Sequence, residues 1–146
     1  MTNDETRGEA TPDGTVHANH AHTRRAGDVH APHADAMHMP QLKLDADGLV
    51  AAVIQDDATG DVLMVGYMDD EALRRTATEG RVTFWSRSRG EYWRKGDTSG
   101  NIQVPRSIAL DCDGDALLIR VDQTGPACHT GARSCFFTPV ETAVEP

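Results

Sequence analysis

Apolar residues recur along the chain from Leu42 onward, in short runs separated by polar turns. The first two runs, residues 49–55 and 62–67, flank a turn rich in Asp and Gly, which predicts a β-hairpin. Asp69 is a good N-cap and Gly80 a good terminator for a helix over residues 70–79. Later runs predict further strands, at residues 81–86, 92–95, 103–110 and 116–121.

Many short strands with one clear helix favour a mainly β fold with short helices, at the border of the α+β class. We expect this folded domain to cover residues 41–146. Residues 1–40 contain almost no large apolar side chains. Such a segment cannot bury enough surface to offset its ordering entropy, so it is expected to be a disordered tail.

The tail is rich in histidine and holds six of the seven histidines of the chain: His17, His20, His22, His30, His33 and His38. Their irregular spacing favours a polar tail with incidental histidines over a tail that scavenges metal. Met37 and Met39, at its end, are candidates for alternative starts of the protein.

The overall composition is that of a globular protein, with 38% hydrophobic and 25% charged residues. The net charge of -9 argues against a general nucleic-acid surface or an anionic-membrane surface. No apolar run approaches the ~20 residues that span a bilayer. The N-terminus has no apolar segment typical of a secretory signal. We therefore expect a cytoplasmic protein.

The cysteines are spaced C-x15-C-x6-C, at Cys112, Cys128 and Cys135. An odd number without a secretory signal argues against a disulfide framework. Three thiolates leave a tetrahedral zinc one ligand short, as in catalytic zinc sites that keep a position for water. His129, adjacent to Cys128, is either a fourth ligand or a base beside the metal. The alternative is three inert cysteines in the core.

The turn between the last two predicted strands carries three acids at every second position, Asp111, Asp113 and Asp115. Oxygen ligands suit Mg²⁺ or Ca²⁺. An EF-hand loop is excluded, because it needs Gly where Ala116 stands and a helix where a strand follows. The competing interpretation is a solvated acidic hairpin turn.

Residues 81–95 form a basic island in an acidic chain, with five cations against Glu91 alone. Such an island suits a phosphorylated small molecule, for which Arg87 and Lys95 are the candidate phosphate ligands. Trp85 and Trp93 flank it and offer a face for a base. The glycines and hydroxyls of the loop at residues 96–101, which include Thr98 and Ser99, can present N–H groups to a phosphate. The alternative is a strand pair with core Trp and exposed Arg.

Six segments occur in an order that resembles phosphoribosyl-AMP cyclohydrolase, an enzyme family of histidine biosynthesis. They are Val62–Met68, Phe84–Arg89, Trp93–Asn101, Asp111–Asp115, Gly125–Gly131 and Ser134–Phe136. The resemblance runs from Leu42 to Phe137, which is nearly all of the predicted domain.

This resemblance implies zinc on Cys112, Cys128 and Cys135, and magnesium on the three aspartates. It also implies an intertwined homodimer, built as a two-sheet sandwich or pseudobarrel, in which both chains supply zinc ligands. The implied reaction is the third step of histidine biosynthesis. In it, zinc-bound water hydrolyses the adenine N1–C6 bond of 1-(5-phosphoribosyl)-AMP, and His129 is the candidate base. Trp85, Arg87, Lys95, Thr98 and Ser99 are the candidate substrate-binding residues.

Two other functions fit some of these features. A zinc nucleobase deaminase also attacks a ring carbon with activated water, but its H-x-E and P-C-x-x-C signatures are absent from the chain. A non-catalytic, metal-stabilised binding module would need a closed zinc site with four protein ligands.

Overall fold

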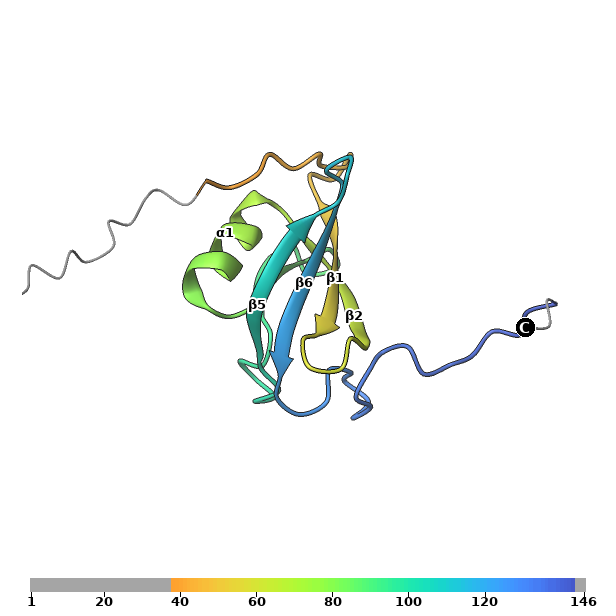
Figure 1. The fold of residues 1–146 in the computed structure, drawn as a ribbon. Helices are drawn as coiled ribbons and strands as arrows, with labels where there is room; N and C mark the ends of the chain where they lie inside the picture. The colour runs from red at the N-terminus through yellow and green to blue at the C-terminus, as the bar shows by residue number, and fades with distance from the viewer. Residues whose placement is uncertain (1–37, 144–146) are drawn as a thin grey trace, which may run out of the picture. The chain divides into compact units, whose positions relative to one another are not determined.

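The computed structural model describes residues 38–143 (Figure 1). Their elements, in chain order, are β1 (Val50–Asp56), β2 (Val62–Met68), α1 (Asp70–Glu79), β3 (Thr83–Ser86), β4 (Glu91–Arg94), β5 (Gln103–Leu110) and β6 (Ala116–Gln123). The predicted tail lies outside the described residues, except for its last positions from His38 on. The hairpin, the helix and the later strands confirm the mainly β prediction.

The strands form two sheets. The larger has the order β2-β1-β6-β5, and the smaller is the β3–β4 hairpin. β1 pairs with β2 and β5 with β6 in antiparallel fashion, whereas β1 and β6 are parallel. The helix and the second sheet lie between β1 and β6 in the sequence, so they form the crossover that a parallel pair requires.

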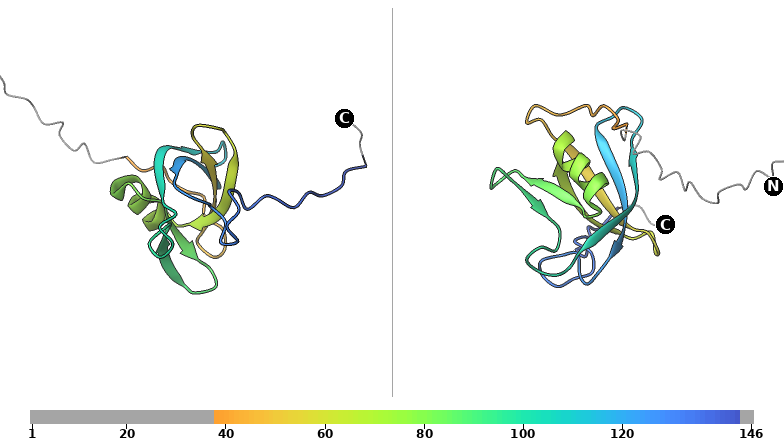
Figure 2. Two further views of the ribbon diagram at one scale, coloured as in Figure 1. Left: turned by 90° about the horizontal axis from the view of Figure 1, so that it is seen from below. Right: turned by 90° about the vertical axis from the view of Figure 1, so that its left-hand side faces the viewer.

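The core lies on the inner face of the larger sheet. Alternate residues of the two central strands are buried there, including Ala52 and Ile54 in β1 and Leu117 and Ile119 in β6. Helix α1 packs against this core and against β3 (Figure 2). The expected two sheets are present, but they do not close into a barrel.

The helix has the predicted caps. Asp69 Oδ1 accepts a hydrogen bond from the Ala72 N–H at 2.8 Å, and Gly80 ends the helix with φ +67°. Asp69 Oδ2 also accepts a 2.6 Å hydrogen bond from the Tyr92 hydroxyl, and this bond raises the Tyr92 pKa to about 12. One side chain thus fixes the start of α1 and ties it to β4.

Strand β3 begins two residues later than predicted. The carbonyl of Val82 accepts from the Lys95 N–H at 2.9 Å, and its N–H donates to the Gln103 carbonyl at 3.1 Å. Val82 therefore joins the end of β4 to the start of β5, and regular β3–β4 pairing begins at Thr83.

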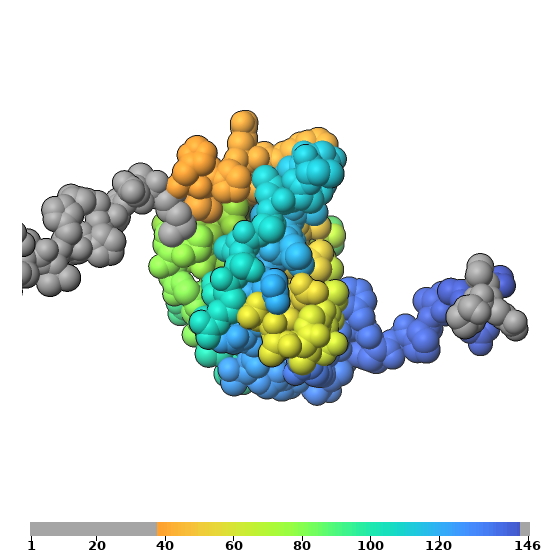
Figure 3. All heavy atoms as spheres, viewed as in Figure 1, coloured from red at the N-terminus to blue at the C-terminus, as the bar shows by residue number. Residues whose placement is uncertain are grey.

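The two ends of the larger sheet carry different segments (Figure 3). The turn between β5 and β6 lies at one end beside residues 41–43, and the Lys43 N–H donates to the Gly114 carbonyl at 2.8 Å. The chain after β6 gathers at the other end (Figure 1). Among the described residues, no helix has the length and apolar character needed to cross a membrane.

We predict that Gly66→Ala lowers the free energy of unfolding by about 1–3 kcal/mol, the usual cost of overpacking a core. A Cβ at Gly66 would overlap the fully buried Phe84 ring. Urea denaturation measures the change. In a Phe84→Leu background the same substitution should cost less, because the smaller side chain leaves room. Equal costs in the two backgrounds would contradict this packing.

Candidate functional site

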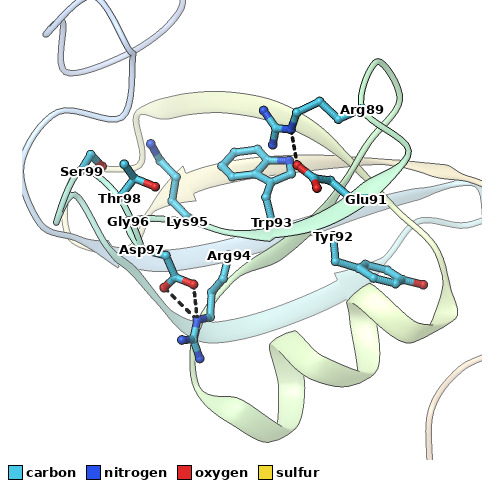
Figure 4. A pocket seen from close by; sticks show the side chains of 10 residues that line it. All are labelled: Arg89, Glu91, Tyr92, Trp93, Arg94, Lys95, Gly96, Asp97, Thr98 and Ser99. Atoms are coloured by element: carbon cyan, nitrogen blue, oxygen red, sulfur yellow. Dashed lines mark hydrogen bonds and ion pairs between the residues drawn. The ribbon is translucent and has the colours of Figure 1, made fainter.

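A cavity of about 600 Å³ lies along β4 and the loop that follows it (Figure 4). Alternation along the strand places Trp93 and Lys95 on the side that also carries Ser99, whereas Tyr92 and Arg94 point to the other side. Thr98 also lines the cavity. The basic strand and the hydroxyl-rich loop predicted from the sequence therefore share one concave surface.

A neighbouring cavity of about 410 Å³ joins this surface to the cysteine loop, residues 125–135. Trp93, Lys95 and Ser99 line both cavities. The second cavity adds three groups with metal-binding chemistry, which belong to Cys128, His129 and Cys135. Residues far apart in the sequence thus meet at one end of the fold.

Hydrogen bonds within the cysteine loop fix its shape. The Cys128 N–H donates to the Ala132 carbonyl at 3.1 Å, and the Gly131 N–H donates to the Cys128 carbonyl at 3.1 Å. The Ala127 N–H reaches the Arg133 carbonyl at 3.0 Å. These bonds fold the loop back on itself, so Cys128 sits on a tight, hydrogen-bonded turn.

Two contacts anchor the loop to the larger sheet. The Arg133 guanidinium lies 3.0 Å from the buried carboxylate of Asp56, at the end of β1. The Cys135 N–H donates to the Leu63 carbonyl in β2 at 2.7 Å. The loop is therefore attached to two strands, and its sulfur atoms have fixed positions relative to the cavity.

The environment favours a thiolate at Cys128. The Thr130 hydroxyl donates to Cys128 Sγ at 3.1 Å, and this hydrogen bond lowers the pKa of the thiol. Cys135 is an exposed residue, but partial burial of its thiol raises the pKa, and the neighbouring Cys128 raises it further. The two thiols thus interact with one another, which suits a pair of ligands to one soft metal.

Lys95 and His129 flank this thiol pair. The buried Lys95 ammonium donates to the Ala127 carbonyl at 2.8 Å. Burial lowers the Lys95 pKa, and the charges of Cys135 and Cys128 oppose that shift. His129 Nδ1 lies 3.9 Å from Cys128 Sγ, on an exposed side chain that lines the cavity.

Cys112, the third predicted zinc ligand, is not part of this group. It is exposed in the turn between β5 and β6, whereas the cysteine loop follows the far end of β6. A strand of eight residues spans about 25 Å, so the two ends of β6 cannot contribute ligands to one ion. A single copy of the chain therefore brings together two of the three thiols.

The three aspartates of the same turn do converge. Among residues 38–143, Asp111, Asp113 and Asp115 are the one group of three or more His, Cys, Asp and Glu side chains that could hold a metal ion, and their ligand atoms all lie within 4.8 Å of one another. Asp111 Oδ1 accepts backbone N–H bonds of 3.0–3.1 Å from Gly114, Asp115 and Ala116. These hydrogen bonds lower the pKa of Asp111, and the bond from the Ala116 N–H has the largest effect.

Lys43 supplies a counter-charge to this turn. Its Nζ lies 3.4 Å from Asp113 Oδ2 and 3.8 Å from Asp115 Oδ2. The three carboxylates are exposed and offer only oxygen donors, a set that suits a hard divalent cation. Asp111 already uses one oxygen to shape the turn, so its other oxygen is the one available to a cation.

The predicted substrate-binding residues are divided between two places. Lys95, Thr98 and Ser99 line the cavities. Trp85 packs edge-on against Tyr92, with ring centroids 4.8 Å apart, and Arg87 stacks on Tyr67 with its guanidinium carbon 3.7 Å from the ring centroid. Neither Trp85 nor Arg87 lines the two cavities.

Trp93, which the sequence offered as a face for a base, and Asn101, which it did not single out, also line the cavities. The Trp93 ring stacks on the ring of the buried Phe84, with the ring centroids 4.7 Å apart, and Trp93 borders both cavities. Asn101, at the end of the loop, lines the second cavity. The alternation of side chains along β4 would have placed Trp93 on the same face as Lys95, two residues away.

A family model and two relatives of known name all indicate the same enzyme family. A family model described as phosphoribosyl-AMP cyclohydrolase matches residues 64–137. The chain is 74% identical over 96 residues to a phosphoribosyl-AMP cyclohydrolase from Bifidobacterium longum (strain DJO10A), covering 66% of this chain and 73% of that protein. It is 64% identical over 102 residues to one from Streptomyces avermitilis, covering 70% and 77%. The chain therefore belongs to the phosphoribosyl-AMP cyclohydrolase family.

Proposed function

We propose that this chain hydrolyses the adenine N1–C6 bond of 1-(5-phosphoribosyl)-AMP, the third step of histidine biosynthesis. The observation that carries the proposal is the shared wall of the two cavities. There the Trp93 ring, the buried Lys95 ammonium and the hydroxyl-rich loop lie next to the two thiols. The ring and the polar groups suit a phosphorylated purine, and the thiols suit a metal that activates water. The named relatives support the same reaction.

The first cavity supplies the groups that would hold the substrate. We assign the purine to the exposed surface of Trp93, because an aromatic ring stacks on a base whatever its substituents. The Thr98 and Ser99 hydroxyls and the Arg89 guanidinium group line the same cavity and suit phosphate oxygens. The Arg89 guanidinium group already contacts Glu91, so phosphate would compete with this exposed pair.

The donor set at the cysteine loop fits zinc. Cys128 and Cys135 supply two interacting thiols, of which one has a lowered pKa. Because Cys112 lies at the far end of β6, the third thiol would come from a second copy of the chain, in a homodimer with two equivalent sites. Zinc bound there would supply a Lewis acid that activates water for attack on the ring.

His129 is placed to accept a proton beside the thiols. In the reaction, the oxygen of water adds to C6, the N1–C6 bond breaks, and N1 gains the proton that the water loses. We assign the transfer of this proton to the His129 ring, which lines the cavity next to Cys128. The rival role, a fourth zinc ligand, would close the site to water.

Magnesium is assigned to Asp111, Asp113 and Asp115, whose oxygens converge in the turn that also carries Cys112. A second copy that brings Cys112 to the cysteine loop would bring these carboxylates as well. A cation there would offset the phosphate charge of the substrate. We place this biosynthetic reaction in the cytoplasm, as the composition of the chain predicts.

Incubation of the purified, zinc- and magnesium-loaded protein with phosphoribosyl-AMP tests the proposal. We expect the ultraviolet spectrum to change as the purine ring opens, with no release of ammonia. Cys128→Ser should abolish turnover, whereas Arg106→Gln, a change in an exposed ion pair outside both cavities, should not. Ammonia release would indicate a deaminase, and an inert protein that retains zinc would indicate a binding module.

His129→Ala is expected to retain its zinc and to lose turnover by roughly 100-fold, the usual scale for a removed general base. Metal analysis and kinetics on the same preparation measure both properties. The matched control is His38→Ala, at the other histidine among the described residues, which lines neither cavity of the site and should leave turnover unchanged. Loss of zinc would make His129 a ligand, and normal turnover would remove it from the mechanism.

A further inference from the structure

The cysteine loop lies against the turn that joins β1 to β2 (Figure 3). Arg133, inside the loop, reaches three groups at this turn. Its guanidinium lies 3.0 Å from Asp56 Oδ2 and 3.5 Å from Asp61 Oδ2, and it donates to the Thr59 hydroxyl at 3.4 Å. The turn thus receives a side chain from a loop that follows 72 positions after Asp61 in the chain.

Asp56, at the end of β1, offers this arginine a fixed partner. Its side chain is only 9% exposed, and Oδ1 accepts backbone N–H bonds from Ala58 at 3.0 Å and from Thr59 at 2.9 Å. The Thr59 bond has the largest effect on the Asp56 pKa and lowers it, burial opposes that shift, and the Arg133 charge lowers the pKa further. The carboxylate is therefore held in place through one oxygen and presents the other to the guanidinium.

Arg133 occupies the neck of the cysteine loop. Its carbonyl accepts the Ala127 N–H at 3.0 Å, which joins the two sides of the loop at this point. Cys128 follows Ala127 directly, and Cys135 comes two residues after Arg133. Lys95 reaches the same neck from the end of β4, through its bond to the Ala127 carbonyl. A displacement of Arg133 would therefore move both thiols.

The two thiols depend on the neck to different degrees. Cys135 is also held directly by β2, because its N–H donates to the Leu63 carbonyl at 2.7 Å. The backbone bonds of Cys128 run to Ala132 and from Gly131, both inside the loop. The position of Cys128 relative to Cys135 is therefore set at the neck, by the residues that hold the neck against the larger sheet.

We propose that Asp56 and Arg133 are positioning residues for the thiol pair, because their contact sets the spacing of Cys128 and Cys135 before a metal binds. The inference rests on the zinc site proposed above. Zinc holds thiolates at about 2.3 Å, so a loop already held in that geometry avoids the ordering cost that a free loop incurs on binding. Neither Asp56 nor Arg133 lines the two cavities of the site, so both act through the loop.

Asp56→Asn and Arg133→Gln in the full chain test this contact. Co²⁺ is the probe, because thiolate ligands give it an absorption band that the histidines of residues 1–40 do not. We expect each variant to bind Co²⁺ at least fivefold more weakly than the parent. The double variant should bind no more weakly than the weaker single variant, because the two residues act as a pair. The matched control is Arg120→Gln, which breaks an ion pair between the same turn and β6 and should bind Co²⁺ as the parent does.

Amide hydrogen exchange of the metal-free proteins distinguishes positioning from general stability. We expect the N–H groups of Ala127, Cys128 and Cys135 to exchange at least tenfold faster in both variants, whereas those of β1 and β6 keep the parent rates. Uniformly faster exchange, or an unchanged Co²⁺ affinity in both variants, would overturn the proposal.

The exchange measurement also keeps this proposal separate from the zinc site on which it rests. A parent protein that binds no Co²⁺ through its thiols would contradict the zinc site, and the exchange rates would still show whether the contact holds the loop. If Asp56→Asn does not fold, Arg133→Gln decides both measurements, because the Arg133 side chain is half-exposed and its loss leaves the core intact.

Discussion

The length of β6 is the constraint on which the proposed site depends. The strand separates the turn with Cys112 and the three aspartates from the loop with Cys128 and Cys135, by about 25 Å for eight residues. Each copy therefore holds the two halves of the proposed metal site at opposite ends of one sheet. A third thiol can reach the pair only from another copy, so the proposed chemistry and the proposed assembly have the same physical origin.

Within one copy, the cysteine loop is held in place by contacts with the larger sheet and with the end of β4. Arg133 joins the cysteine loop to the buried carboxylate of Asp56 on the larger sheet, and Lys95 joins it to β4 through the Ala127 carbonyl. Lys95 was predicted as a phosphate ligand. Its buried ammonium lines the substrate cavity and also lies beside the thiols, whose charges raise its pKa against the effect of burial. One side chain thus links the substrate cavity with the thiol pair.

Local signals in the sequence predicted most of the fold. Asp69 and Gly80 delimit α1 because capping depends on a few adjacent residues, and the three hairpins follow from short turns. The parallel pairing of β1 with β6 joins residues more than 60 positions apart, and no local pattern encodes it. The site shows the same division. Lys95, Thr98 and Ser99 line the cavities, whereas Trp85 packs on Tyr92, because strand pairing decides which face its side chain occupies. Arg87, in the turn after β3, stacks on Tyr67.

Complementation between two inactive variants tests most directly whether each site draws thiols from both copies. Cys112→Ser and Cys128→Ser proteins should each be inactive as purified. In a mixed dimer, one site combines both defects and the other has none. After unfolding, mixing in equal amounts and refolding, random pairing should restore about a quarter of the parent activity. Activity that stays absent although mixed dimers form, or a Cys112→Ser protein that is active by itself, would contradict the account.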